Sequence, residues 1–105
     1  MNKERRRKLY KLQTSLATIA ETFDKEAVSL YSKELEEICF QEEDAFDNMP
    51  EGLQSSMNGM AAEEAIDYMN EALAYLEEAA DAETQEEFEE AVDAAVDCLA
   101  DAENV

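Results

Sequence analysis

Apolar side chains recur at intervals of three and four residues along most of the chain, the spacing of one face of an α-helix. The first such row consists of Leu9, Leu12, Leu16, Ile19, Phe23, Val28, Tyr31, Leu35, Ile38, Ala45, Phe46 and Met49. No glycine or proline interrupts it, so the pattern predicts one long helix over residues 4–47. Thr22 and Asp24 are residue types that cap helices, so a kink near Phe23 is the alternative to a continuous helix.

The clearest interruption comes at Pro50 and Gly52, where a helix cannot continue and a turn can close. Polar residues follow, so the sequence predicts a turn over residues 48–59. A second helix over residues 60–81 is indicated by a further apolar row, formed by Ala62, Ala65, Ile66, Met69, Leu73, Leu76 and Ala80.

Thr84 followed by Glu87 is a capping-box pattern and marks the start of a third helix, over residues 85–102. The apolar positions of that helix are Phe88, Val92, Ala95, Leu99 and Ala102. The elements predict a single all-α domain spanning 1–105, folded either as a long antiparallel helical hairpin or as a three-helix bundle. A hairpin would place basic residues 3–11 beside Asp97, Asp101 and Glu103.

The formal net charge is -20, and the charged residues are unevenly distributed along the chain. Six of the eight Lys and Arg residues lie in the first eleven positions, and the last one is Lys33. Residues 34–105 carry 24 of the 28 acids and no base. Helices normally gain from Glu–Lys pairs four residues apart, and like charges repel. We therefore expect the excess of acid to serve a purpose other than stability.

Candidate chemistry is sparse. The chain has no histidine, no glycine-rich phosphate loop and no motif around its serines, and Cys39 and Cys98 lack metal or redox spacing. The acids around Glu42 and Asp47 are wrongly spaced for a calcium loop. We therefore expect no enzymatic activity, no cofactor, no specific metal site and two reduced thiols. No signal peptide or membrane span is evident, which predicts a cytoplasmic protein and no membrane partner.

The acidic helices suggest imitation of DNA. One acid in three residues places a charge every ~4.5 Å along a helix, and two helices side by side reach one per ~2.3 Å. A B-form duplex carries one negative charge per about 1.7 Å. We expect a DNA-binding protein to contact the acids that project from the last two helices: Glu63, Glu64, Asp67, Glu71, Glu77, Glu78, Glu86, Glu87, Glu89, Glu90 and Asp93.

The rival hypothesis is a helical adaptor or assembly protein that binds a partner through its apolar seam. Met57 and Met60 lie where packing should be thin, and exposed methionine makes an adaptable contact surface. A homodimer is a further alternative. The basic segment 3–11 either pairs with acids of the same chain or touches a second partner, although direct nucleic-acid binding is not expected of the protein.

A resemblance adds to this reading. The run from Glu42 to Gln54 (EEDAFDNMPEGLQ), followed by Ala62–Asp67 and Glu71–Leu73, resembles the conserved centre of small uncharacterised acidic proteins from phages and mobile elements of Gram-positive bacteria. It covers roughly residues 1–80. The resemblance implies a counter-defence role of the anti-CRISPR or anti-restriction type, with a Cas nuclease or a restriction enzyme of the bacterial host as the target.

Overall fold

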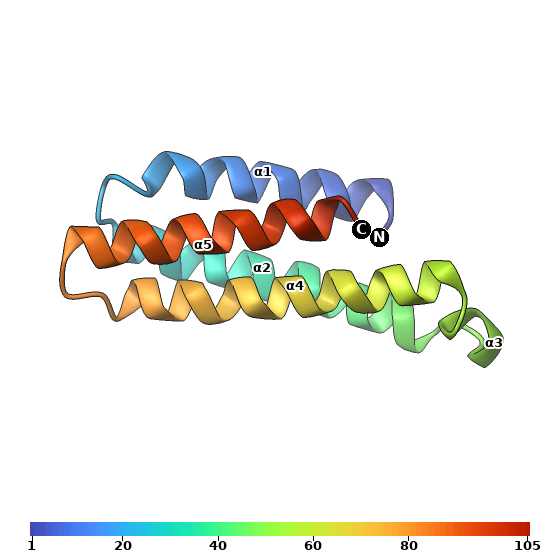
Figure 1. Cartoon of the computed structure of the whole chain (residues 1–105). Coiled ribbons are helices and arrows are strands. Elements are labelled where there is room, and N and C mark those ends of the chain that lie inside the picture. Colours follow the sequence, from blue (N-terminus) through green and yellow to red (C-terminus); the bar gives the residue numbers. More distant parts are fainter.

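Four long helices and one short helical turn account for most of the computed structural model, which covers residues 1–105. The helices are α1 (Lys3–Ile19), α2 (Lys25–Asp47), α3 (Glu51–Gln54), α4 (Met57–Ala80) and α5 (Gln85–Glu103). They form a rod of 47 × 20 × 19 Å (Figure 1). The all-α bundle predicted from the sequence is confirmed.

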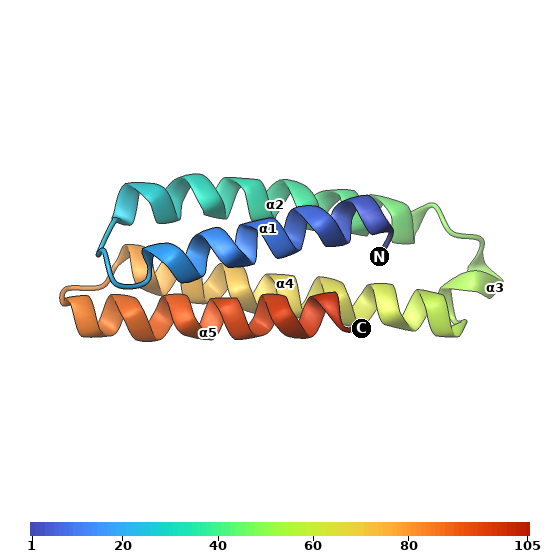
Figure 2. The ribbon, with the colours of Figure 1, turned by 90° about the horizontal axis from the view of Figure 1, so that it is seen from above.

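The four long helices run alternately in opposite directions along the rod (Figures 1 and 2). Each packs on two others: α1 on α2 and α5, and α4 on α2 and α5. Short connections favour such antiparallel neighbours. The start of α1 and the end of α5 therefore lie at the same end of the rod (Figure 2).

The predicted continuous helix over residues 4–47 is wrong, because the chain reverses direction between Ile19 and Lys25 and forms two helices there. Phe23 adopts a left-handed backbone conformation, with φ of 57°, and its ring packs on Phe88 of α5 at a centroid distance of 5.4 Å. The Asp24 side chain then caps α2 by accepting from Ala27 N at 3.0 Å. The reversal gives a bundle of four long helices instead of a hairpin or three helices.

The predicted turn over residues 48–59 is shorter than expected, because it contains α3 and because α4 begins at Met57 rather than at residue 60. Ser56 caps α4 by accepting from Gly59 N at 3.3 Å. A Cβ at Gly59 would lie 2.5 Å from the Leu53 carbonyl oxygen. Only glycine allows this close approach of α3 to α4.

The core combines large apolar side chains from all four long helices with alanines from α4 and α5. Phe88, Leu9, Leu16, Leu35, Met69, Leu76 and Leu99 are its largest fully buried hydrophobic side chains. Ala65, Ala72, Ala91 and Ala95 lie between them and let α4 and α5 pack closely. The apolar rows identified in the sequence therefore point inward, into the bundle.

Candidate partner-binding surface

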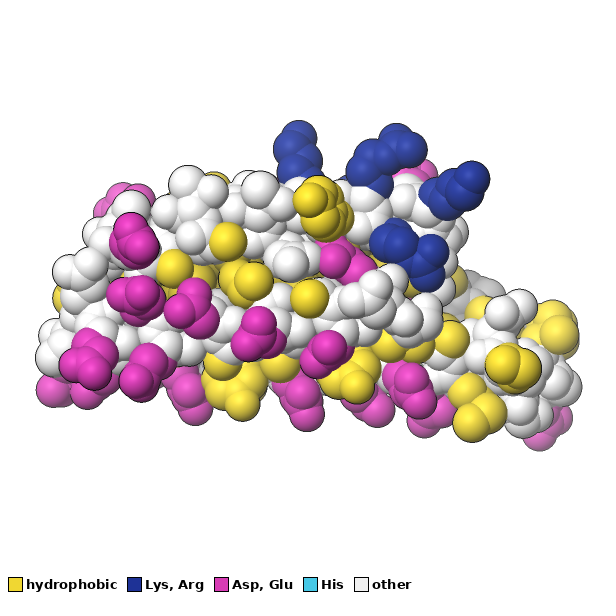
Figure 3. Space-filling view, turned by 45° about the horizontal axis from the view of Figure 1, so that its top comes forward, with side chains coloured by type: hydrophobic (Ala, Val, Ile, Leu, Met, Phe, Trp, Pro, Cys, Tyr) yellow, Lys and Arg dark blue, Asp and Glu magenta, His cyan; other side chains and the backbone are white.

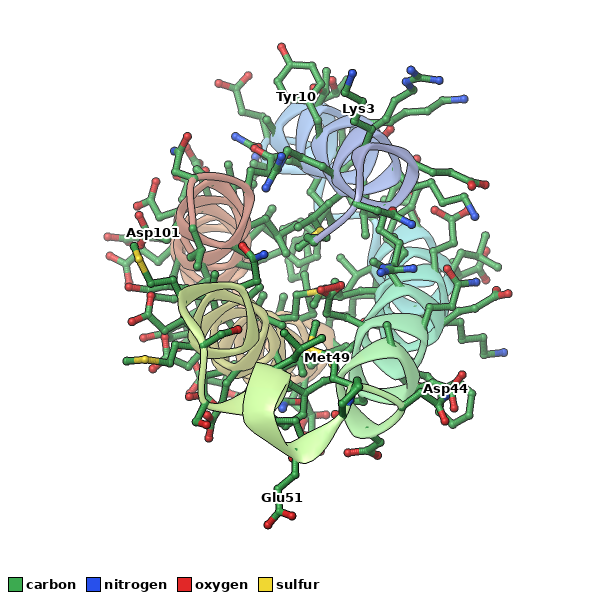
Figure 4. All side chains as sticks on the ribbon, turned by 90° about the vertical axis from the view of Figure 1, so that its right-hand side faces the viewer. Lys3, Tyr10, Asp44, Met49, Glu51 and Asp101 are labelled. Carbon is green, nitrogen blue, oxygen red and sulfur yellow. The ribbon has the colours of Figure 1, made fainter.

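Charge is segregated between the helices. α1 carries six bases and one acid, whereas residues 57–103, which span α4 and α5, carry sixteen acids and no base. Lys and Arg side chains gather over the start of α1, and Asp and Glu side chains spread over the rest of the visible face (Figure 3). In the end-on view, Lys3 on α1 and Asp101 on α5 project on different sides of the bundle (Figure 4).

The acids of α4 and α5 form two rows at helical spacing. The α4 row consists of Glu64, Asp67, Glu71 and Glu78, and the α5 row consists of Glu86, Glu90, Asp93, Asp97 and Asp101. All nine side chains are exposed. Residues three and four apart share one side of a helix, so the α5 row is a continuous line of charge, whereas the α4 row is interrupted between Glu71 and Glu78.

Two observations show that Glu71 and Glu78 of the α4 row and Glu90 of the α5 row border the groove between α4 and α5. Near the α4–α5 connection, a groove of about 520 Å³ is lined by Tyr75, Glu78, Asp81, Glu87, Glu90 and three alanines. Further along, Cys98 Sγ of α5 lies 3.8 Å from Glu71 Oε2 of α4. We call the two rows and this groove the acidic face.

The pKa of Cys98 is affected by carboxylates of both helices. Burial raises the pKa of this thiol, and the carboxylates of Glu71, Asp101 and Asp97 raise it further. Acids from both helices therefore act on one point of the groove. A cationic side chain of a partner would meet carboxylates from both sides there.

Not all the acids predicted to contact a partner belong to the acidic face. Glu77 lies instead in the groove between α4 and α2, which Lys33 and Glu36 also line. Glu89 is only half exposed, and Glu63 is exposed on α4 next to the row. The α5 row also includes Asp97 and Asp101, which the sequence analysis did not assign to the partner-binding surface. Their spacing of four residues along the helix from Asp93 could have identified them. Tyr75 and Asp81 carried no such signal.

The basic end of α1 is tied into the bundle by Glu42, the one buried charged residue, which is 2% exposed. Its carboxylate accepts from Arg5 Nε at 2.9 Å and lies 3.4 Å from the Met1 ammonium group. The sequence analysis considered Glu42 as a functional residue only among acids wrongly spaced for a calcium loop, although it follows Ile38 by four residues and so falls on the apolar seam. The ion pairs with these two cations make its burial tolerable.

The expected register between the start of α1 and the end of α5 is confirmed only at the last residues. Arg6 Nη2 donates to the Val105 carbonyl oxygen at 3.5 Å. Burial raises the pKa of Glu103, and the nearby Arg6 guanidinium opposes that rise. Asp97 and Asp101 lie near Cys98 instead, and neither forms an ion pair with α1.

Every long helix begins with a capping side chain and ends without a cation. Asn2, Asp24, Ser56 and Thr84 each accept a backbone N–H. Glu87 N donates to Thr84 Oγ1 as the capping-box pattern predicts, but the Glu87 carboxylate accepts from Glu83 N. No helix has a base in its last turn. Carboxylates at the negative ends of α2, α4 and α5 are unfavourable by about 0.3–1 kcal/mol each.

The two cysteines are free, and both are buried. Burial, followed by the Glu43 carboxylate, raises the pKa of Cys39 to about 12. Its Sγ lies 3.6 Å from Glu43 Oε1. Since the thiolate is the nucleophile, thiols held in this state are poorly reactive. No three Asp, Glu or Cys side chains converge in a way that could hold one metal ion.

No protein-family model, curated protein or solved structure matches this chain. The resemblance to acidic proteins of phages and mobile elements therefore stays a prediction. None of the helices is both long enough and apolar enough to cross a bilayer.

Proposed function

We propose that this protein is a non-enzymatic inhibitor that imitates DNA and occupies the nucleic-acid groove of a bacterial DNA-binding defence protein. A Cas nuclease or a restriction enzyme is the favoured target, and the cytoplasm of the bacterial host is the place of action. The observation that carries the proposal is the acidic face, which lies within residues 57–103, a stretch with sixteen acids, no base and no ion pair within the molecule.

The dimensions support this proposal. Over the 47 Å length of the rod, a B-form duplex would span about 14 base pairs and carry roughly 28 negative charges. The protein carries 28 acids and a net charge of -20, or one net charge per roughly 2.4 Å of its length. Its charge density thus approaches that of the duplex, and its width of 20 × 19 Å is comparable as well.

Solubility alone accounts poorly for this surface. A small domain stays soluble with a net charge of about 2–8, and mixed signs serve that purpose at no electrostatic cost. Here the acids repel one another along both rows and also occupy unfavourable helix ends. A function that requires an uninterrupted negative surface explains why no lysine is interspersed.

The alternative is a helical adaptor that binds through its apolar seam. In the folded bundle that seam is buried, so an adaptor of this kind would have to open the bundle. The exposure of Met57 and Met60, which are 88% and 56% exposed, still favours a hydrophobic contribution to partner binding.

The decisive experiment is capture of partners from a bacterial lysate at low salt, with competing duplex DNA in half of the samples. We expect DNA to displace a captured nuclease or another DNA-binding protein, and added salt to weaken the capture steeply. A partner that ignores both DNA and salt would overturn DNA imitation and support the adaptor.

A matched pair of variants locates the surface. Glu64→Gln/Glu71→Gln/Glu78→Gln removes three charges from the acidic face, and Glu34→Gln/Glu36→Gln/Glu37→Gln removes three exposed charges from α2. We expect only the first triple variant to lose the DNA-displaceable partner. Equal losses in both would show that net charge, and not this face, determines binding.

A further inference from the structure

An apolar tip closes one end of the rod. It consists of Leu53, Met57 and Met60, which are 54%, 88% and 56% exposed. Leu53 belongs to α3, and the two methionines belong to the first turn of α4 (Figure 1). Hydrophobic side chains are visible at that end of the space-filling surface (Figure 3). Large side chains exposed together at one place differ from the scattered exposed residues normal on protein surfaces.

The tip is held in place by hydrogen bonds. Gln54 Nε2 donates to the Phe46 carbonyl oxygen of α2 at 3.1 Å, and Leu53 N donates to the Pro50 carbonyl oxygen at 2.8 Å. On the other side, the Ser56 hydroxyl donates to the Leu53 carbonyl oxygen and caps α4. Because α3 is tied to both neighbouring helices, its apolar side chain is presented at a defined position.

The tip continues the acidic face. Met57, Met60, Glu64, Asp67 and Glu71 follow one another at intervals of three and four residues, all exposed. They therefore lie along one side of α4, with the apolar pair at its beginning. A partner that lies along the carboxylates meets the methionines at the end of the same line.

The size and charge of the surface indicate the kind of partner. Three side chains are far too few for the roughly 800 Å² that each partner buries in a stable interface, so the tip needs the acidic face beside it. A second copy fits poorly, because it would bring another net charge of -20 alongside. Anionic lipid is repelled for the same reason. Charge complementarity favours a basic protein surface.

We propose that the apolar tip is an anchor that enters an apolar pocket at one end of the partner's basic groove and thereby fixes which way round the acidic rod binds. This inference rests on the proposed function, since it assigns the acidic face to that groove. The two contributions differ physically: carboxylate contacts weaken with salt, whereas burial of methionine and leucine does not.

Two labelled helical peptides test the anchor on the full-length protein. One has lysine along one face and a leucine cluster at one end; the other has serine in place of the leucines. We expect the leucine peptide to bind the wild type about tenfold more tightly, as burial of two or three apolar side chains allows. Met57→Gln/Met60→Gln should abolish that advantage equally at 50 mM and 300 mM NaCl and leave the serine peptide unaffected.

A matched variant separates the two contributions. Glu64→Gln/Glu71→Gln should weaken both peptides and reduce the salt dependence, while the leucine peptide keeps its advantage. The anchor is overturned if the two methionine substitutions leave the advantage of the leucine peptide intact. It is also overturned if sedimentation shows a dimer that these substitutions dissociate, or if neutral vesicles bind the wild type but not the variant.

The proposed function can fail separately. If duplex DNA does not displace partners captured from a lysate but the methionine effect on the peptides persists, DNA imitation fails and the anchor stands. If DNA displaces the partner and the methionine substitutions change neither peptide binding nor partner capture, the anchor fails and DNA imitation stands.

Discussion

The start of α1 and the α4–α5 pair differ in whether their charged side chains form ion pairs. On α1, Arg5 pairs with buried Glu42, Lys8 lies 3.6 Å from Glu4, and Arg6 reaches the end of the chain. On α4 and α5, no acid forms an ion pair. The few cations thus stabilise one end of the bundle, whereas the acids of α4 and α5 have no cationic partner within the molecule.

The substitution expected to reduce stability most lies in the apolar core beneath the acidic face. Phe88→Ala removes the largest core side chain of α5 and the partner of the Phe23 ring. We expect a loss of about 3–5 kcal/mol in the free energy of unfolding, measured by urea denaturation. A loss below about 1 kcal/mol would contradict the view that packing, and not charge, holds α5 in place.

Breaking the buried ion pair of α1 should have the next largest effect. Glu42→Ala leaves the Arg5 guanidinium and the Met1 ammonium without their carboxylate. We expect the free energy of unfolding to fall by about 3 kcal/mol. Glu36→Ala, at an exposed position of the same helix, is the control and should change it by less than about 0.5 kcal/mol. Similar values for both variants would remove the distinction between paired and free acids.

Neutralising the acidic face should do the opposite and stabilise the fold. Glu71→Gln/Asp97→Asn/Asp101→Asn relieves repulsion around Cys98, and we expect a gain of about 1 kcal/mol at low salt. The gain should shrink at high salt because exposed charges are screened. Removing cations with Lys3→Gln/Lys11→Gln is the matched control and should lower stability slightly. The same sign of change for both variants in thermal melts would contradict the charge segregation described here.

The smallest effect concerns Glu103, where the two regions meet. Its folded-state pKa is raised by burial, so the folded protein binds this proton more readily than the unfolded chain does. Stability contributed by this group therefore rises as pH falls through the folded pKa. We expect Glu103→Gln to raise Tm slightly at pH 7 and to raise it less at pH 4, because the wild-type carboxyl takes up its proton more readily in the folded state as the pH falls. An equal rise at both pH values would point to side-chain packing instead.

Some parts of the candidate partner-binding surface could be predicted from the sequence, and others could not. The acid rows follow from spacing, because residues three and four apart share a side of any helix. The placement of Glu77 toward α2 and of Glu89 in a half-buried position could not be predicted in the same way. Which side of a helix meets a neighbour depends on how the helices are arranged in the bundle.

The same division holds for the fold. Local patterns in the sequence were enough to predict an all-helical fold, the interruption at Pro50, the capped start at Thr84 and the absence of bases after Lys33, because helical periodicity and capping act over a few residues. The reversal at Phe23, the burial of Glu42 and the approach of acids from α4 and α5 to one groove became evident only from the folded structure. These features depend on contacts between residues far apart in the chain, which no local pattern specifies.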